Sequence, residues 1–190
     1  MAPPRIVYLH GFASGPGSVK ARDFRRRFAE RGIDLAIPDL NEPGGFEGLT
    51  LTRMLGVVRP LAPEVLIGSS LGGYTAALLA AREPSVRAVV LMAPAFDFPR
   101  RIAPVLGPDS PLVRDGLAYE AFPDVRCPAL VLHGVRDETV PVELSREFGK
   151  SRKNVTLVEL DDDHLLHASM ERMWAETLAF LGRVGVVAIG

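Results

Sequence analysis

Hydrophobic residues along this chain alternate between short continuous runs and longer segments with helical spacing. The run Ile6–Leu9 is β-branched and aromatic and is soon followed by a glycine, which is typical of a buried strand. From Ser18 to Gly32, apolar residues recur between charges at intervals that predict an amphipathic helix. The same alternation predicts further strands at 34–37, 65–67, 86–92, 129–132 and 155–160, and further helices at 49–58, 71–82, 141–148 and 167–181.

Strands and helices that alternate in this way form a mostly parallel sheet with helices on both faces. We therefore expect one α/β domain over residues 1–190, with about six strands in a three-layer arrangement. Between Met92 and Pro128 the alternation gives way to a proline-rich, irregular stretch that is long for a plain connection. We interpret residues 95–123 as a short cap. Ligands of such sheets bind beyond the carboxyl ends of the strands, so residues at those ends carry the candidate chemistry.

Composition and charge narrow the class of protein. The 190 residues are 47% hydrophobic, enough for one buried core but not for two comfortable domains. The formal charge of −1, with no basic patch beside aromatic residues, predicts no nucleic-acid partner. Neither a secretory leader nor an apolar run of about 18 residues is found, so we expect a cytoplasmic monomer or homodimer without membrane association. Cys127, the single cysteine, permits no intrachain disulfide and is expected to be a buried packing residue.

The segment with the most specific pattern is Gly68-Ser69-Ser70-Leu71-Gly72. It matches G-x-S-x-G between a strand and a helix, the arrangement of a nucleophile elbow, and makes Ser70 the candidate nucleophile. The Leu71 N–H lies at the predicted helix start and is a candidate donor to an oxyanion. Without catalysis, Ser70 would be a helix N-cap in a glycine-rich turn. Ser69 holds the spacer position and is the weaker candidate.

The first predicted strand is followed by His10-Gly11-Phe12, and this glycine allows the backbone to approach a substrate closely. Phe12 N–H is the candidate second oxyanion donor, and His10 is interpreted as a structural brace. The following loop also suggests dinucleotide binding, but the fingerprint is incomplete because Lys20 stands where a third glycine is needed. A non-catalytic or nucleotide-binding module is therefore the alternative function, and we expect no cofactor.

A serine nucleophile needs a base and an orienting acid, in the chain order Ser, Asp, His for this architecture. Asp137 follows the predicted strand 129–132 and is the candidate acid, with Asp97 as its rival and Glu138 one position away. His164 follows the last strand and is the candidate base, with His167 as the alternative. Three aspartates precede His164, but adjacent side chains diverge, so we expect no metal.

These segments resemble the small bacterial esterases of the YqiA type within the α/β-hydrolase superfamily. The resemblance rests on His10-Gly11-Phe12, on the run Gly68-Ser69-Ser70-Leu71-Gly72-Gly73-Tyr74, and on Asp137 and His164; the elbow is also similar to that of mitochondrial acyl-thioesterase relatives. It implies a reduced α/β-hydrolase fold without the first antiparallel strands. It also implies hydrolysis of carboxylic esters, or alternatively thioesters, by Ser70, Asp137 and His164. After Met92 the sequence departs from the bacterial pattern.

The apolar side chains of the expected cap bear on the substrate. Most of them are expected to pack in the core, while Phe96 and Phe98 of the cap, together with Phe12 in the loop after the first strand, are the candidates for contact with an acyl group. A small cap without a separate lid predicts short or medium acyl chains. The expected partner is thus a small acyl ester or thioester.

Overall fold

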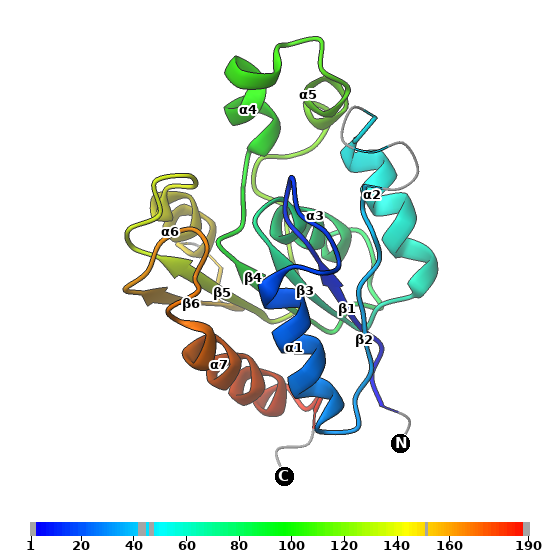
Figure 1. Ribbon diagram of the computed structural model, residues 1–190, viewed down its shortest axis with the longest axis vertical. Coiled ribbons are helices and arrows are strands. Elements are labelled where there is room, and N and C mark those ends of the chain that lie inside the picture. Colours follow the sequence, from blue (N-terminus) through cyan, green and yellow to red (C-terminus); the bar gives the residue numbers. More distant parts are fainter. Residues whose placement is uncertain (1–2, 42–44, 46–47, 151, 188–190) are drawn as a thin grey trace.

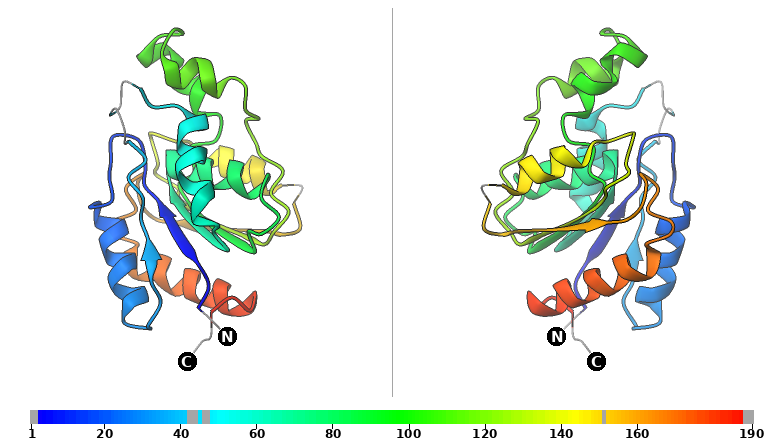
Figure 2. Two further views of the ribbon diagram at one scale, coloured as in Figure 1. Left: turned by 90° about the vertical axis from the view of Figure 1, so that its right-hand side faces the viewer. Right: turned by 90° about the vertical axis from the view of Figure 1, so that its left-hand side faces the viewer.

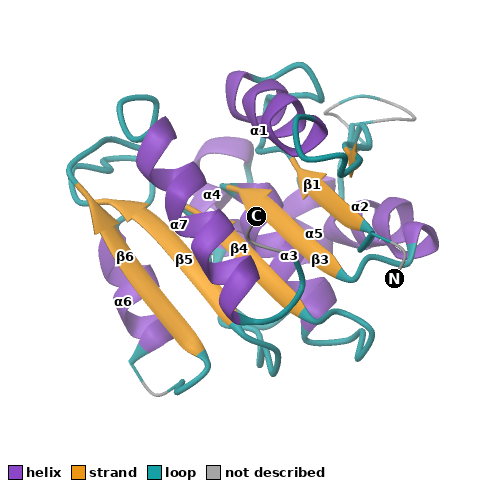
Figure 3. Ribbon diagram, turned by 90° about the horizontal axis from the view of Figure 1, so that it is seen from below, coloured by secondary structure: helices purple, strands orange, loops and turns teal. Residues whose placement is uncertain are grey.

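A parallel sheet forms the centre of the molecule, whose computed structural model describes residues 3–41, 45, 48–150 and 152–187. The strand order is β2-β1-β3-β4-β5-β6, and every neighbouring pair is parallel (Figure 3). The strands are β1 (Ile6–Leu9), β2 (Leu35–Ala36), β3 (Val65–Ser69), β4 (Ala88–Met92), β5 (Ala129–Gly134) and β6 (Val155–Leu160). The helices are α1 (Val19–Ala29), α2 (Leu51–Val58), α3 (Leu71–Ala80), α4 (Phe98–Leu106), α5 (Pro111–Gly116), α6 (Val142–Gly149) and α7 (Met170–Arg183), and the 3₁₀ turn η1 covers Arg59–Leu61.

Successive residues of each central strand are buried on opposite faces of the sheet, which accounts for continuous apolar runs. In β1, Ile6 and Tyr8 join a core beneath α1 and α7, whereas Val7 and Leu9 join a second core. Helices α2, α3 and α6 cover that second face (Figures 1 and 2). The predicted three-layer α/β fold with about six strands is thereby confirmed.

The edges of the sheet differ from its centre. Strand β2 has only two residues, shorter than the predicted 34–37, and β6 is largely half-exposed along its length. Every residue of helix α3 is buried. The helix packs on β1, β3 and β4 of the sheet and is in contact with α2. Cys127 is half-buried against the second core rather than fully buried as expected. No helix in the described part of the chain is long and apolar enough to cross a membrane.

The segment predicted to be irregular contains two helices, α4 and α5, which rise beyond the carboxyl ends of the strands (Figure 1). The sequence pattern did not predict these helices. Pro99 and Pro111 lie in first turns, where no N–H donor is needed, while Pro104 lies inside α4. Asp115 of α5 accepts hydrogen bonds from the N–H and the hydroxyl of Thr52 at 2.9 and 2.5 Å. These bonds attach α5 to α2.

Candidate active site

The turn between β3 and α3 has the geometry of a nucleophile elbow. Ser70 has φ 55° and ψ −120°, a conformation that L-residues rarely adopt. A Cβ at Gly68 would overlap the Gly72 carbonyl, and a Cβ at Gly72 would overlap the Leu9 and His10 carbonyls. The G-x-S-x-G spacing is therefore required by close backbone packing on both sides of the serine.

Ser70, His164 and Asp137 form a continuous line of hydrogen bonds. His164 Nε2 lies 3.1 Å from Ser70 Oγ, and His164 Nδ1 lies 2.7 Å from Asp137 Oδ2. The three side chains follow β3, β6 and β5 respectively, and parallel strands bring their carboxyl ends to one edge of the sheet. The Asp137 side chain is fully buried, while 18% of the His164 side chain is exposed. The structure thus brings together all three residues that the sequence selected.

Asp137 is held as a carboxylate by more than His164. Its Oδ1 accepts hydrogen bonds from the N–H groups of Thr139 and Val140 at 2.9 and 2.7 Å, and its Oδ2 lies 3.2 Å from His133 Nε2. Burial by itself raises the pKa of Asp137, but the hydrogen bonds from His133, His164 and Val140 outweigh it and hold the pKa well below the usual range. The acid is therefore charged at any pH near neutrality.

His133, a residue of β5 that the sequence analysis did not select, supports the candidate acid. It is fully buried, its Nδ1 lies 2.6 Å from Ser145 Oγ, and its Nε2 lies 2.9 Å from the Val140 carbonyl oxygen. Together with the contact to Asp137, these bonds fix the loop that carries the acid. The only feature of the sequence that could have indicated this role is that His133 lies four residues before the candidate acid.

The rival candidates lie in other environments. Asp97 caps α4 and pairs with Arg100 at 2.7 Å, and Glu138 is exposed. His167 is also exposed, although it lines the same pocket as Ser70. His10 is buried and its Nε2 accepts a hydrogen bond from the Leu40 N–H at 3.0 Å, which agrees with a bracing role.

The two segments predicted to supply oxyanion donors both lie close to Ser70. Leu71 is the first residue of α3, where N–H groups have no acceptor within the helix and the helix dipole favours negative charge. On the other side, Gly11 packs so closely that an added Cβ would lie 3.2 Å from Ser70 Cβ, and Phe12 lines the pocket with Ser70. Both segments therefore border the space above the serine.

The three phenylalanines selected as substrate contacts separate into two groups. Phe12 and Phe98 are half-buried and in contact, with ring centroids 5.7 Å apart. Phe96 is fully buried and stacks on Phe148 at 4.4 Å, so it belongs to the core and not to a substrate surface. The Phe96 assignment is corrected because its side chain points into the sheet–helix interface beneath the cap.

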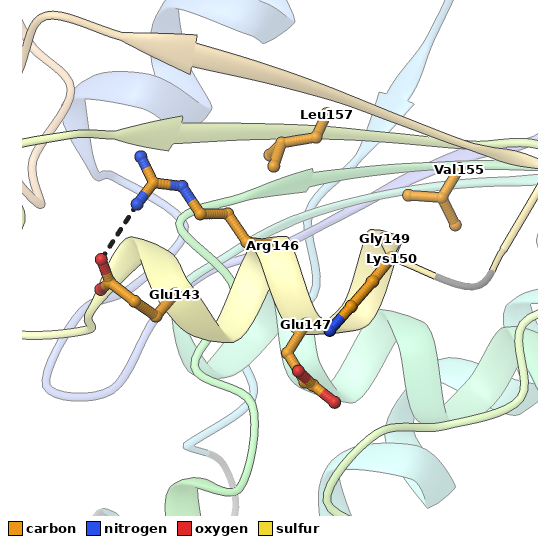
Figure 4. A pocket seen from close by; sticks show the side chains of 7 residues that line it. All are labelled: Glu143, Arg146, Glu147, Gly149, Lys150, Val155 and Leu157. Atoms are coloured by element: carbon orange, nitrogen blue, oxygen red, sulfur yellow. Dashed lines mark hydrogen bonds and ion pairs between the residues drawn. The ribbon is translucent and has the colours of Figure 1, made fainter.

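A hollow of about 490 Å³ lies away from Ser70, between α6 and the edge strand β6 (Figure 4). Val155 and Leu157 form its floor, and Arg146 pairs there with Glu143 at 3.0 Å. It contains none of the candidate catalytic residues. Among the described residues, no cluster of three His, Cys, Asp or Glu side chains is arranged to hold a metal ion.

Comparison with solved structures defines the class of protein. Est1E from Butyrivibrio proteoclasticus is 23% identical with a TM-score of 0.79, covering 95% of this chain and 89% of Est1E. A protein from Xanthomonas campestris pv. campestris, assigned to the alpha/beta superfamily of hydrolases, is 26% identical with a TM-score of 0.73, covering 98% of this chain and all of that one (100%). Alpha/beta hydrolase domain-containing protein 10 from mouse is 20% identical with a TM-score of 0.79, covering 97% and 92%. The chain is an α/β hydrolase.

The family can also be stated. Residues 5–182 match the model of an uncharacterised protein family, UPF0227, and the chain belongs to that family. No curated protein matches the sequence. The resemblance to small α/β-hydrolase esterases that the motifs indicated is thereby confirmed.

Proposed function

We propose that this α/β hydrolase cleaves carboxylic esters of short or medium acyl chains, with Ser70 as the nucleophile. The observation that carries the proposal is the hydrogen-bonded line from Ser70 through His164 to the buried, ionised Asp137. A serine hydroxyl is a weak nucleophile, and such a line supplies the base and the charge that orients it. Its location at a strained elbow beyond the strands supports the same conclusion.

The proposed reaction consists of acylation of Ser70 and hydrolysis of the acyl-enzyme. Ser70 Oγ attacks the ester carbonyl carbon while its proton passes to His164 Nε2, and the carbonyl oxygen becomes an oxyanion near the Phe12 and Leu71 N–H groups. The bond to the alcohol breaks as His164 returns the proton to the leaving oxygen. Water then attacks the acyl-enzyme with His164 again as base, which releases the acid and restores Ser70.

The half-buried Phe12–Phe98 pair supports an apolar acyl group beside Ser70. Ferulic acid has been observed bound to Est1E, one of the structural relatives. Phe98 begins α4, so the cap contributes directly to this apolar surface, which is formed by two aromatic rings with centroids 5.7 Å apart. A short acyl chain therefore fits the site better than a long one.

A panel of 4-nitrophenyl acetate, butyrate, octanoate and palmitate tests the proposed function. We expect kcat/KM to be highest for butyrate or octanoate and lowest for palmitate, because the Phe12–Phe98 surface is short. Matched butyryl and octanoyl thioesters distinguish a thioesterase from an esterase. No hydrolysis of any member would contradict the proposal, and stabilisation by nucleotides in a thermal-shift assay would then favour the nucleotide-binding alternative.

The acid limb of the pH profile should report a single proton. Only neutral imidazole can accept the Ser70 proton, so kcat/KM should fall about tenfold per pH unit once His164 is protonated. The lowered pKa of Asp137 keeps this carboxylate charged throughout that range, and its contribution to stability is lost only when the pH falls through that lowered value. Rates measured in a pH-stat should therefore show a limiting slope of one. A flat profile would contradict a histidine base, and a slope of two would show that Asp137 titrates with it.

A further inference from the structure

A small polar pocket adjoins Ser70 and His164 on the side of the sheet covered by α1. It encloses about 110 Å³, and Tyr8, Ser18, Lys20 and Ser69 contribute to its wall. At about 30 Å³ for each water molecule in the liquid, this is the space of three or four waters. The pocket is thus large enough for a carboxylate.

The Tyr8 hydroxyl supplies an unused donor to this pocket. Tyr8 is fully buried, and its hydroxyl oxygen has no hydrogen-bond partner among the described residues. Ser69 and Ser18 lie near enough to offset part of the rise in pKa that burial causes, but neither meets hydrogen-bond geometry. Tyr8 therefore stays a neutral phenol, and a buried hydroxyl is costly unless an acceptor occupies the pocket.

Lys20 adds a buried positive charge. Its Nζ donates to the Leu165 carbonyl oxygen at 2.6 Å, the only hydrogen bond of the Lys20 side chain within the described part of the chain. Burial lowers the pKa of Lys20, while Asp163, Asp162 and Asp137 offset part of that effect and favour the charged form. An ammonium has three N–H donors, so the geometry leaves donor capacity for a ligand.

The first turn of α1 reinforces the positive potential. Ser18 caps this helix of 11 residues, no acidic residue lies in its first turn, and Ser18 and Val19 both line the pocket. A helix N-terminus carries a partial positive charge, so Lys20 stands where a cation is unfavourable unless an anion is near. Two sources of positive potential and one orphan donor therefore converge beside the nucleophile.

We propose that this pocket binds a small anionic group, a carboxylate, on the alcohol part of the ester substrate. The assignment rests on the proposed ester hydrolysis. It places the alcohol here because His164, which must protonate the leaving oxygen, forms part of the pocket wall. The acyl group then lies along the Phe12–Phe98 pair, where Phe12 borders this pocket. The preferred substrates are acyl esters of short hydroxy acids.

A matched pair of substrates tests the inference: the butyryl ester of glycolic acid and that of glycolamide, which differ in charge but hardly in size. In a pH-stat at neutral pH, the wild type should have a kcat/KM about tenfold or more higher for the glycolate ester, the effect of one hydrogen bond to a charged group. Lys20→Met and Tyr8→Phe should each bring this ratio close to one. A general loss of activity in a variant lowers kcat/KM for both esters alike, so it cancels in the ratio of the two values.

Two controls separate ligand binding from structural roles. Arg22→Met removes an exposed cation from the same helix and should leave the ratio unchanged. Tyr8→Phe should not lower the melting temperature, because it deletes a hydroxyl that has no partner in the protein.

The outcomes are distinct. If neither ester nor any 4-nitrophenyl ester is hydrolysed, the proposed function fails. If both butyryl esters are cleaved equally well, the pocket holds only water and the inference alone fails. A preference for the glycolate ester that survives both pocket substitutions would also overturn the assignment to Tyr8 and Lys20.

Discussion

Replacement of Ser70 by alanine should abolish ester hydrolysis, with kcat falling on the order of 10⁴- to 10⁶-fold. The expected loss is chemical, because Ala at this position removes only the oxygen that lies 3.1 Å from His164 Nε2. The backbone strain of the elbow, at φ 55°, is the same for alanine as for serine. The measurement is steady-state hydrolysis of 4-nitrophenyl butyrate together with labelling by a fluorophosphonate probe, which should modify the wild type and not the variant.

Ser70→Gly provides the matched control. Glycine tolerates positive φ, so this variant should be as inactive as Ser70→Ala but no less stable than the wild type. Thermal unfolding of the three proteins measures this directly. Equal labelling of wild type and Ser70→Ala, or retention of turnover in either variant, would show that Ser70 is not the nucleophile.

Asp137→Asn should reduce kcat by on the order of 10³- to 10⁴-fold, since a misplaced donor forces the wrong histidine tautomer. The Asn oxygen must remain at the Oδ1 position, where the N–H groups of Thr139 and Val140 need an acceptor. The new NH₂ group then occupies the Oδ2 position, 2.7 Å from His164 Nδ1. His164 Nδ1 then has to accept a hydrogen bond from this NH₂ group, so the imidazole proton moves to Nε2. There it prevents His164 from removing the Ser70 proton.

Asp97→Asn is the control for the acid. Asp97 is paired with Arg100 on the surface of the cap, so its change should affect kcat by less than about threefold. Circular dichroism and thermal unfolding should show that both variants are folded, although Asp137→Asn should be less stable because its NH₂ also faces His133. A large loss in Asp97→Asn with near-normal turnover in Asp137→Asn would reverse the assignment of the acid.

Local patterns predicted the sheet and its helices because their causes are local. The central strands are continuous apolar runs, since both faces of the sheet are covered, and α1 has the spacing of a helix with one buried face. The elbow was also readable, because the close packing of Gly68 and Gly72 allows no side chain at those positions. In α4 and α5, the same local reading failed, since prolines in first turns do not prevent a helix and α4 continues past an interior proline, Pro104.

The sequence by itself determined which residues follow strands: Ser70, Asp137 and His164 were selected because parallel strands carry their functional groups at one edge. The distances between them depend on how β3, β5 and β6 are ordered in the sheet, and only the tertiary structure decided that. Whether a residue faces the core or the site is likewise a matter of tertiary packing. Phe96 and Phe98 lie two positions apart in one loop-to-helix segment, yet the first is stacked on α6 and the second contacts Phe12.

The polar pocket shows the same division most clearly. In the sequence, Tyr8 is a strand residue, and Lys20 is the residue that stands in place of the third glycine of a nucleotide-binding fingerprint. Neither pattern contains information about the other. The structure places both beside Ser70, since α1 packs on the face of β1 toward which Tyr8 points. Burial of a phenol and an ammonium in one cavity is a property of long-range packing, and no local pattern along the chain encodes it.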